Sequence, residues 1–276
     1  FKYFSCDENT MAFTGHAMAL YLDDSYLKRP ARECIDRVQL YAYSLSRYGN
    51  SPYIYPVWGL GGLPEGFSRL CAIHGGVYML NKPIEKILYN DDGTVKGVQC
   101  KDEEHPAYCK KLLADPSYFI GTDKVKKVGQ VARMICIMSH PIKDTNNADS
   151  AQIILPAKHT GRRSDIYISM VSYHHQVAAQ GKYVAVVSLN VESKQPEKEF
   201  APALALLGKA DVRFSWVSDQ YAPTDDGSKD NIFVTSSYDA TSHFETATKE
   251  IMSIYERLTG QPVDLTAKPD DLGKDE

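Results

Sequence analysis

Paired histidines are the first residues in this sequence with a spacing that could support metal chemistry. His174 and His175 follow a run, 165 to 173, with the composition of a β-strand. Adjacent side chains on a strand point to opposite faces, so the two rings cannot easily bind one ion. No third ligand has a zinc-site spacing. We interpret both as structural or surface histidines and predict no metal site.

Asp239 and His243 are four residues apart, with serines nearby, at the start of a helix expected over 241 to 258. A hydrolase of this kind would need an exposed nucleophile, but the G-x-S-x-G pattern is absent. The Asp239 carboxylate is better explained as a helix cap that accepts backbone N–H bonds. The sequence therefore predicts no catalytic triad.

Glycines 59, 61 and 62 resemble the start of a phosphate-binding loop. A dinucleotide fingerprint needs a strand before the first glycine and a helix in frame after the third. Here proline and aromatic residues precede the glycines, and Leu63-Pro64 interrupts the frame. We predict no bound cofactor.

Composition excludes several functional classes. The chain has 276 residues and a net charge of -4, so no basic excess points to nucleic acid. No apolar run is long enough to span a bilayer. The six cysteines are dispersed without a C-x-x-C pattern, which favours free thiols in a reducing, cytosolic setting. Because Phe1 is not an initiator residue, we expect a fragment that lacks an upstream part.

Helical patterns dominate the first fifty residues. Residues 9 to 22 mix large apolar and very small residues, which predicts a buried helix. The small face either lets two helices approach closely or leaves room for an apolar ligand. Pro30 begins a second helix that Gly49 ends. From 51 to 80 we expect a loop, a helix starting near Pro64, a turn at Gly75-Gly76 and a short strand.

Strand patterns dominate the rest of the chain. An Asp92-Gly93 turn predicts a hairpin over 84 to 100, and a helix is expected at 197 to 207. Further strands are expected at 107–114, 131–139, 151–156, 165–173, 182–191, 211–218 and 231–237. The fold class is therefore α/β or α+β with a large sheet. We expect domains at 1–48 and 49–265, followed by a flexible tail at 266–276.

One long segment, YPVWGLGGLPEGFSRLCAIHGGVYMLNKPI, closely resembles the central signature of the GDP dissociation inhibitors of Rab-type small GTPases. The segments FTGHAMALY, SLSRYGNSPYIYP, CIMSHPIKDTN, SDIYISMVSYHHQVAAQGKY and SYDATSHFETATKEI resemble the same family in the same order. The resemblance extends to about Gly260.

This resemblance implies a flavin-oxidase-like, multi-sheet large domain with a smaller inserted all-α domain, of which 1–48 would be the end. It implies a non-enzymatic protein that binds GDP-bound, prenylated Rab GTPases, slows GDP release, and extracts them from and delivers them to membranes. The expected location is the cytoplasm, with transient peripheral membrane contact. The alternatives are a Rab escort protein and an FAD-dependent oxidoreductase of the same fold, or a structural fragment of an inactive oxidase fold.

The resemblance also assigns site residues. The Rab-binding platform would include Arg69 and Met79, together with Gly62 and Val77, where the family usually has Glu and Thr. A mobile effector loop would include Arg47, Ser51 and Tyr53. An apolar slot for the prenyl lipid is expected in the helical segment, with the candidates Met11, Gly15, Met18, Ala19, Leu22 and Val38.

Overall fold

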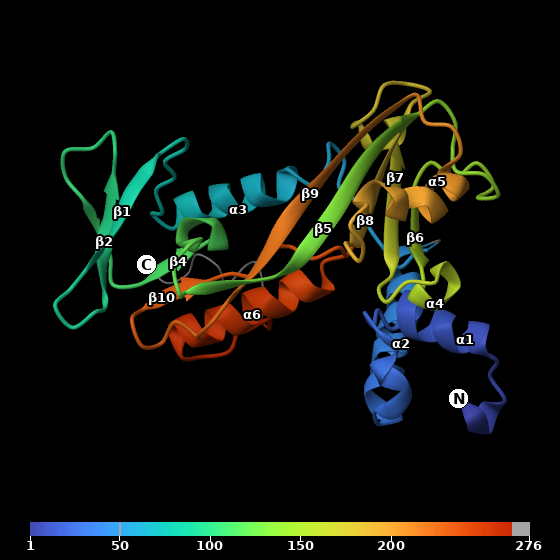
Figure 1. Cartoon of the computed structure of the whole chain (residues 1–276), viewed down its shortest axis with the longest axis horizontal. Helices are drawn as coiled ribbons and strands as arrows, with labels where there is room; N and C mark the ends of the chain where they lie inside the picture. The colour runs from blue at the N-terminus through green and yellow to red at the C-terminus, as the bar shows by residue number, and fades with distance from the viewer. Residues whose placement is uncertain (50, 267–276) are drawn as a thin grey trace. The chain divides into compact units, whose positions relative to one another are not determined.

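The computed structural model describes residues 1–49 and 51–266 (Figure 1). These residues form two compact units. The first contains residues 1–78, 129–218 and 239–243, and the second contains the described parts of 79–128, 219–238 and 244–276. The division into these two units does not coincide with the domain boundary predicted near residue 48, since residues on both sides of it belong to the first unit. The assignment of 1–48 to a lipid-binding domain stays a prediction, and the expected tail beyond Thr266 lies outside the described residues.

A five-stranded sheet with the strand order β6-β7-β8-β5-β9 forms the core of the first unit. The strands are β5 (Val125–Met138), β6 (Ala151–Leu155), β7 (Ile166–Ser172), β8 (Tyr183–Asn190) and β9 (Val212–Pro223). Both β5 and β9 continue into residues of the second unit. All these strands were predicted, although β5 and β9 are longer than expected.

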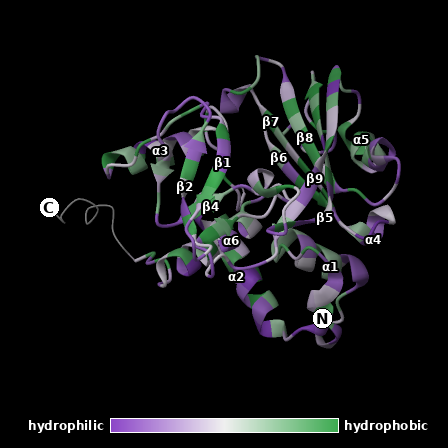
Figure 2. Cartoon of the chain, turned by 60° about the vertical axis from the view of Figure 1, so that its left-hand side comes forward, coloured by the Kyte–Doolittle hydropathy of each residue, from purple (hydrophilic) through white to green (hydrophobic). Residues whose placement is uncertain are grey.

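Alternating residues of the central strands make one buried face. Ile168 of β7 lies opposite Val187 of β8, which lies opposite Met134 of β5. Figure 2 shows that apolar residues recur along these strands, and the members of the buried cluster, such as Met134, Cys136 and Met138 of β5, occupy every second position. The short helices η6 (Pro196–Phe200) and α5 (Ala201–Leu207) cover this face with Phe200 and Leu207. The helix expected at 197–207 is therefore confirmed.

The N-terminal helices are more broken than expected. They are η1 (Lys2–Phe4), α1 (Glu8–Ala12), the π-helical η2 (Phe13–Met18), η3 (Asp24–Lys28) and α2 (Ala31–Tyr48). The single helix predicted for 9–22 is wrong, because the chain widens into a π-turn after Ala12 and leaves the helix after Met18. Leu20 then adopts a left-handed φ of 55°.

The prolines and glycines of the sequence predict the ends of the next two helices correctly. α2 begins after Pro30 and ends before Gly49, and α3 (Gly62–Ile73) has Pro64 in its first turn. A turn follows α3 at Gly75. The short strand expected from Val77 is wrong, because residues 76–83 have no strand partner.

The second unit contains two small sheets and one long helix. Its elements are β1 (Ile84–Tyr89), β2 (Val95–Cys100), β3 (Ala107–Tyr108), β4 (Leu112–Ala114), η4 (Pro116–Phe119), β10 (Ile232–Val234) and α6 (Glu245–Thr259). The predicted hairpin is confirmed, with Gly93 at φ +83° in its turn. The strand expected over 107–114 is split between the two sheets.

Asp239 does not cap a helix, which corrects our expectation. Its carboxylate accepts hydrogen bonds from the backbone N–H and the hydroxyl of Thr241 within a turn. The helix α6 starts later, at Glu245. Among the described residues, the helices are all too short or too polar to cross a bilayer.

Candidate functional site

Helix α3 presents all of its side chains to solvent, because none of them is buried. A 3.6-residue repeat places Gly62, Gly66, Arg69 and Ile73 on one face. Leu63, Phe67 and Leu70 share a neighbouring face and are also exposed. An isolated short helix that exposes this many apolar residues is typical of a surface that another molecule covers.

The two predicted platform residues on α3 lie on the same face. The exposed Arg69 guanidinium has no hydrogen bond or ion pair with another residue in the described part of the chain. The space that a side chain at Gly62 or Gly66 would enter is open. The Arg69 guanidinium, with its planar set of hydrogen-bond donors, therefore lies beside a surface formed by the two glycines, which have no side chains.

The other two predicted platform residues are exposed apolar side chains. Val77 is 84% exposed and lies after α3 in the first unit, whereas Met79 is 60% exposed and belongs to the second unit. Their joint role in one platform stays a prediction.

The loop before α3 is fixed at Trp58. The Trp58 backbone N–H donates to the carbonyl oxygen of His175 at 2.8 Å, and the Tyr55 ring packs edge-on against the His175 ring. Trp58 has a φ of 69° and is 79% exposed. A bulky residue rarely adopts positive φ, and such strain concentrates at functional sites.

The predicted effector-loop residues have different surroundings. Arg47 lies in the last turn of α2, exposed, with its guanidinium 5.7 Å from the Tyr48 ring centroid. The Ser51 hydroxyl accepts a hydrogen bond from the Tyr53 backbone N–H at 3.1 Å. Burial raises the pKa of Tyr53 to about 12. Tyr53 is thus a partly buried residue of the loop, not a freely exposed one.

The predicted lipid slot is not open at Gly15. A Cβ atom there would lie 2.0 Å from Cζ of Tyr26, so the Tyr26 ring already fills this space. Ala19 is buried in the same cluster, and Val38 packs against that cluster. The structure thus shows that these small residues pack against Tyr26. Of the other candidates, Met11 and Met18 are half-buried and Leu22 is exposed.

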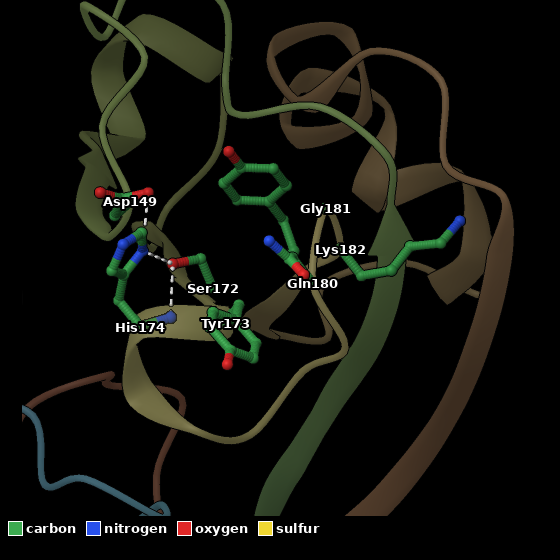
Figure 3. Close-up of a pocket in the computed structure, with 8 residues that line it drawn as sticks. Asp149, Ser172, Tyr173, His174, Gln180, Gly181 and Lys182 are labelled. Atoms are coloured by element: carbon green, nitrogen blue, oxygen red, sulfur yellow. Dashed lines mark hydrogen bonds and ion pairs between the residues drawn. The ribbon is translucent and has the colours of Figure 1, made fainter.

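A polar cavity of about 170 Å³ lies beside the end of β7 (Figure 3). His174 and His175 are in the 3-10 turn η5 (Tyr173–His175) and not on a strand, which corrects the basis of our prediction. The Ser172 hydroxyl and the Asp149 carboxylate both contact the same nitrogen of His174, at 3.4 and 3.1 Å. A proton relay needs the two partners on different ring nitrogens. Figure 3 also shows the Lys182 side chain directed away from His174.

Two features of the structure were missed by sequence reasoning. Trp58 could have been singled out, because a tryptophan inside a proline- and glycine-rich loop is a local signal. His16 could not, because its partners are set by tertiary structure: Asp165, which contacts the His16 ring, lies 149 residues further along the chain.

The family model for GDP dissociation inhibitors matches residues 1–270. The chain is 53% identical to Rab GDP dissociation inhibitor beta of Rattus norvegicus over 265 residues, which are 96% of this chain and 58% of the relative. The crystal structure of a Rab GDI from Plasmodium falciparum aligns with a TM-score of 0.92 and 50% identity, covering 95% of this chain and 59% of that one. A flavin-dependent brominase, Bmp2, aligns over 73% of this chain and 56% of its own with a TM-score of only 0.45 and 11% identity.

The chain spans a little under three fifths of the length of the relatives it matches. Within that span the agreement with the inhibitors extends over nearly every described element. The family model, the sequence identity and the structural alignment all indicate the same family. The chain belongs to the GDP dissociation inhibitor family.

Proposed function

We propose that this chain is the part of a Rab GDP dissociation inhibitor that holds the GTPase through α3. The observation that carries the proposal is a helix without a buried residue, on which Arg69, unpaired among the described residues, adjoins the open surface of Gly62 and Gly66. The relatives named as Rab GDP dissociation inhibitors support the identity of the partner.

The proposed partner is a GDP-bound, prenylated Rab GTPase. Binding to the GDP form slows GDP release, since any ligand that favours one nucleotide state stabilises it. The protein then extracts the GTPase from membranes and delivers it to them. Its location is cytoplasmic, with transient peripheral contact during these steps. It acts by binding and not by catalysis.

Arg69 has a specific role in this proposal. A guanidinium that donates to a carboxylate or carbonyl oxygen of the partner makes a charge-assisted hydrogen bond, which is stronger than a neutral one. Arg69→Ala removes the donors without breaking a hydrogen bond or ion pair among the described residues. The change should therefore affect binding and leave folding intact.

The test measures the release of a fluorescent GDP analogue from a purified Rab in the presence of the 276-residue chain. The parent chain should slow release, and Arg69→Ala should weaken binding by about 1.5 to 3 kcal/mol, or roughly 10- to 150-fold. Arg163→Ala is the matched control, since Arg163 is exposed and its guanidinium has only a 3.8 Å contact with Glu192. A release rate that the parent chain does not change would contradict the proposal.

A further inference from the structure

His16 is a buried histidine with a carboxylate at each ring nitrogen. Its side chain is only 3% exposed and belongs to the π-helical turn η2. Nδ1 lies 2.7 Å from Oδ2 of Asp165, which is fully buried just before β7. Nε2 lies 3.1 Å from Oδ1 of Asp24, at the start of η3. The ring thus connects three separate elements of the first unit.

The number of hydrogen atoms on the His16 ring depends on the charge of its two carboxylate partners. An ionised carboxylate only accepts hydrogen bonds. The other oxygen of Asp165 accepts the backbone N–H of Ala157 at 2.8 Å, and Asp24 is 61% exposed to water. With both ionised, the two contacts are hydrogen bonds only when His16 carries a proton on each nitrogen.

We propose that His16 is a proton-dependent clamp that holds the segment Asp7–Lys28 against the sheet at the start of β7. When the imidazolium loses a proton, one carboxylate faces a nitrogen lone pair. That contact changes from an attraction into a repulsion between two acceptors, inside a site from which water is largely excluded.

The groups around His16 determine the direction of the pH effect. Burial alone would lower the pKa of His16, but the hydrogen bonds and charges of Asp165 and Asp24 outweigh burial, so its pKa is raised. Asp23 adds a more distant carboxylate, and Tyr26 faces the ring edge-on with its centroid 5.7 Å away. A raised pKa means that the clamp contributes its full stability below 6.5, the ordinary histidine value, and loses it as pH rises through the folded-state pKa.

Release of the clamp would loosen the packing around Tyr26. This ring stacks on Tyr21, with 5.0 Å between centroids, and lies over Gly15. Its hydroxyl donates to the carbonyl oxygen of Met11 at 2.8 Å. These contacts join η3 to η2 and α1, so the segment would open as a unit and leave the β7–β8 core intact.

Imidazole NMR on the 276-residue chain tests the protonation state. More than half of the His16 rings should carry a proton on both nitrogens at pH 6.5, where an ordinary histidine is half deprotonated. Asp24→Asn keeps the shape of the side chain and removes one charge, so it should lower the pKa of His16. Asp149→Asn is the control, because Asp149 pairs with the exposed His174 and not with His16.

Amide hydrogen exchange tests the mechanical consequence. Above pH 6.5, protection of the Ala19 and Tyr21 amides, which donate to Thr14 and Gly15, should fall by up to about tenfold per pH unit until the folded-state pKa is passed. The protection of amides in β7 and β8 should not decrease with pH in this way. In Asp24→Asn the protection of the Ala19 and Tyr21 amides should decrease less, and the decrease should end at a lower pH.

Two results would overturn the proposal. One is a folded chain in which half or more of the His16 rings have lost a proton at pH 6.5. The other is protection at Ala19 and Tyr21 that follows the β7–β8 amides at every pH in both the parent and Asp24→Asn. Because Asp24 is largely exposed, the variant is expected to fold, and its melting temperature at pH 5.5 checks this.

Discussion

The Tyr26 hydroxyl donates a hydrogen bond to the main-chain oxygen of Met11, and the same ring occupies the space that a side chain at Gly15 would need. The two contacts fix η3 against the preceding helical turns. They also explain why a glycine stands at position 15, although its φ is an ordinary negative one. The requirement at this position is space for an aromatic ring.

The first prediction concerns this contact. Gly15→Ala places a methyl group inside the van der Waals radius of the Tyr26 ring, so we expect a loss of about 1 to 3 kcal/mol in the free energy of unfolding. Urea denaturation measures it. Gly66→Ala is the control, because Gly66 is an exposed helical residue with open space around it. That change should be neutral or stabilise by up to about 1 kcal/mol. Equal effects at both positions would contradict the packing argument.

The second prediction concerns Gly62, where the family resemblance implies a glutamate. Gly62→Glu adds a carboxylate at the first residue of α3, where it meets the positive end of the helix and no neighbouring atom. Folding should be unchanged or slightly stabilised, and binding to a Rab with a basic group at the contact should tighten.

Gly61→Glu is the matched control for that variant. It adds the same charge one residue earlier, where the surroundings are equally open, but on a different side of the helix start. Titration of both variants with a GDP-loaded Rab compares them. A loss of affinity in Gly62→Glu across all Rabs would mean that the partner needs the flat glycine surface.

The third prediction concerns Trp58. The ring is exposed and its backbone is strained, so a glycine at this position should relieve strain. We expect Trp58→Gly to be more stable than Trp58→Ala by up to about 1 kcal/mol, despite the entropy that glycine adds to the unfolded chain. Both variants should lose the same affinity for Rab if the ring contacts it. A binding difference between them would instead assign the effect to the loop conformation.

The fourth prediction concerns the buried ion pair of Arg162 and Glu199. The Arg162 Nη1 atom lies 2.6 Å from Oε2 of Glu199, and the two side chains are 9% and 7% exposed. Burial alone would raise the pKa of Glu199, but hydrogen bonds from Ser193 and Arg162 outweigh burial and lower it. The pair therefore contributes stability above the ordinary glutamate pKa and loses it as pH falls through the lowered value.

Glu199→Gln removes the shorter of the two carboxylate contacts of Arg162, which keeps Glu192 at 3.5 Å, so we expect a loss of about 1.5 to 3 kcal/mol at pH 7. The difference from the parent should narrow as the pH falls below 4.5, the ordinary glutamate value. Urea unfolding at pH 7 and pH 4 measures both effects. Glu245→Gln disrupts a more exposed pair with Lys249 and should cost no more than about 0.5 kcal/mol.

Local signals in the sequence predicted the elements whose ends are set locally. Pro30 and Gly49 enclose α2, and the Asp92-Gly93 turn fixes the first hairpin, in each case through backbone preferences of one or two residues. Short runs rich in β-branched and other apolar residues predict β5 to β8, and alternate residues of β5, β7 and β8 enter the core.

Three departures from the sequence-based expectations involve tertiary contacts. The π-turn after Ala12 contains His16, whose partner Asp165 lies 149 residues away, and Gly15, which packs against Tyr26 of η3. The apolar run from Val77 has the composition of a strand but no neighbour to pair with. At position 15 the sequence leaves helix packing and a lipid slot both open, because it shows a small residue and does not show which side chain packs against it.

The separation between His16 and Asp165 also has a consequence for the order of folding. Their hydrogen bond closes a loop of 149 residues, so the partner of His16 is synthesised long after His16 itself. At about 5 to 20 residues per second, the delay is roughly 7 to 30 s. During this time His16 has no access to Asp165, and the Asp7–Lys28 segment lacks the sheet against which it packs. We expect this segment to acquire its native structure only after β7 has emerged from the ribosome, although it is synthesised first.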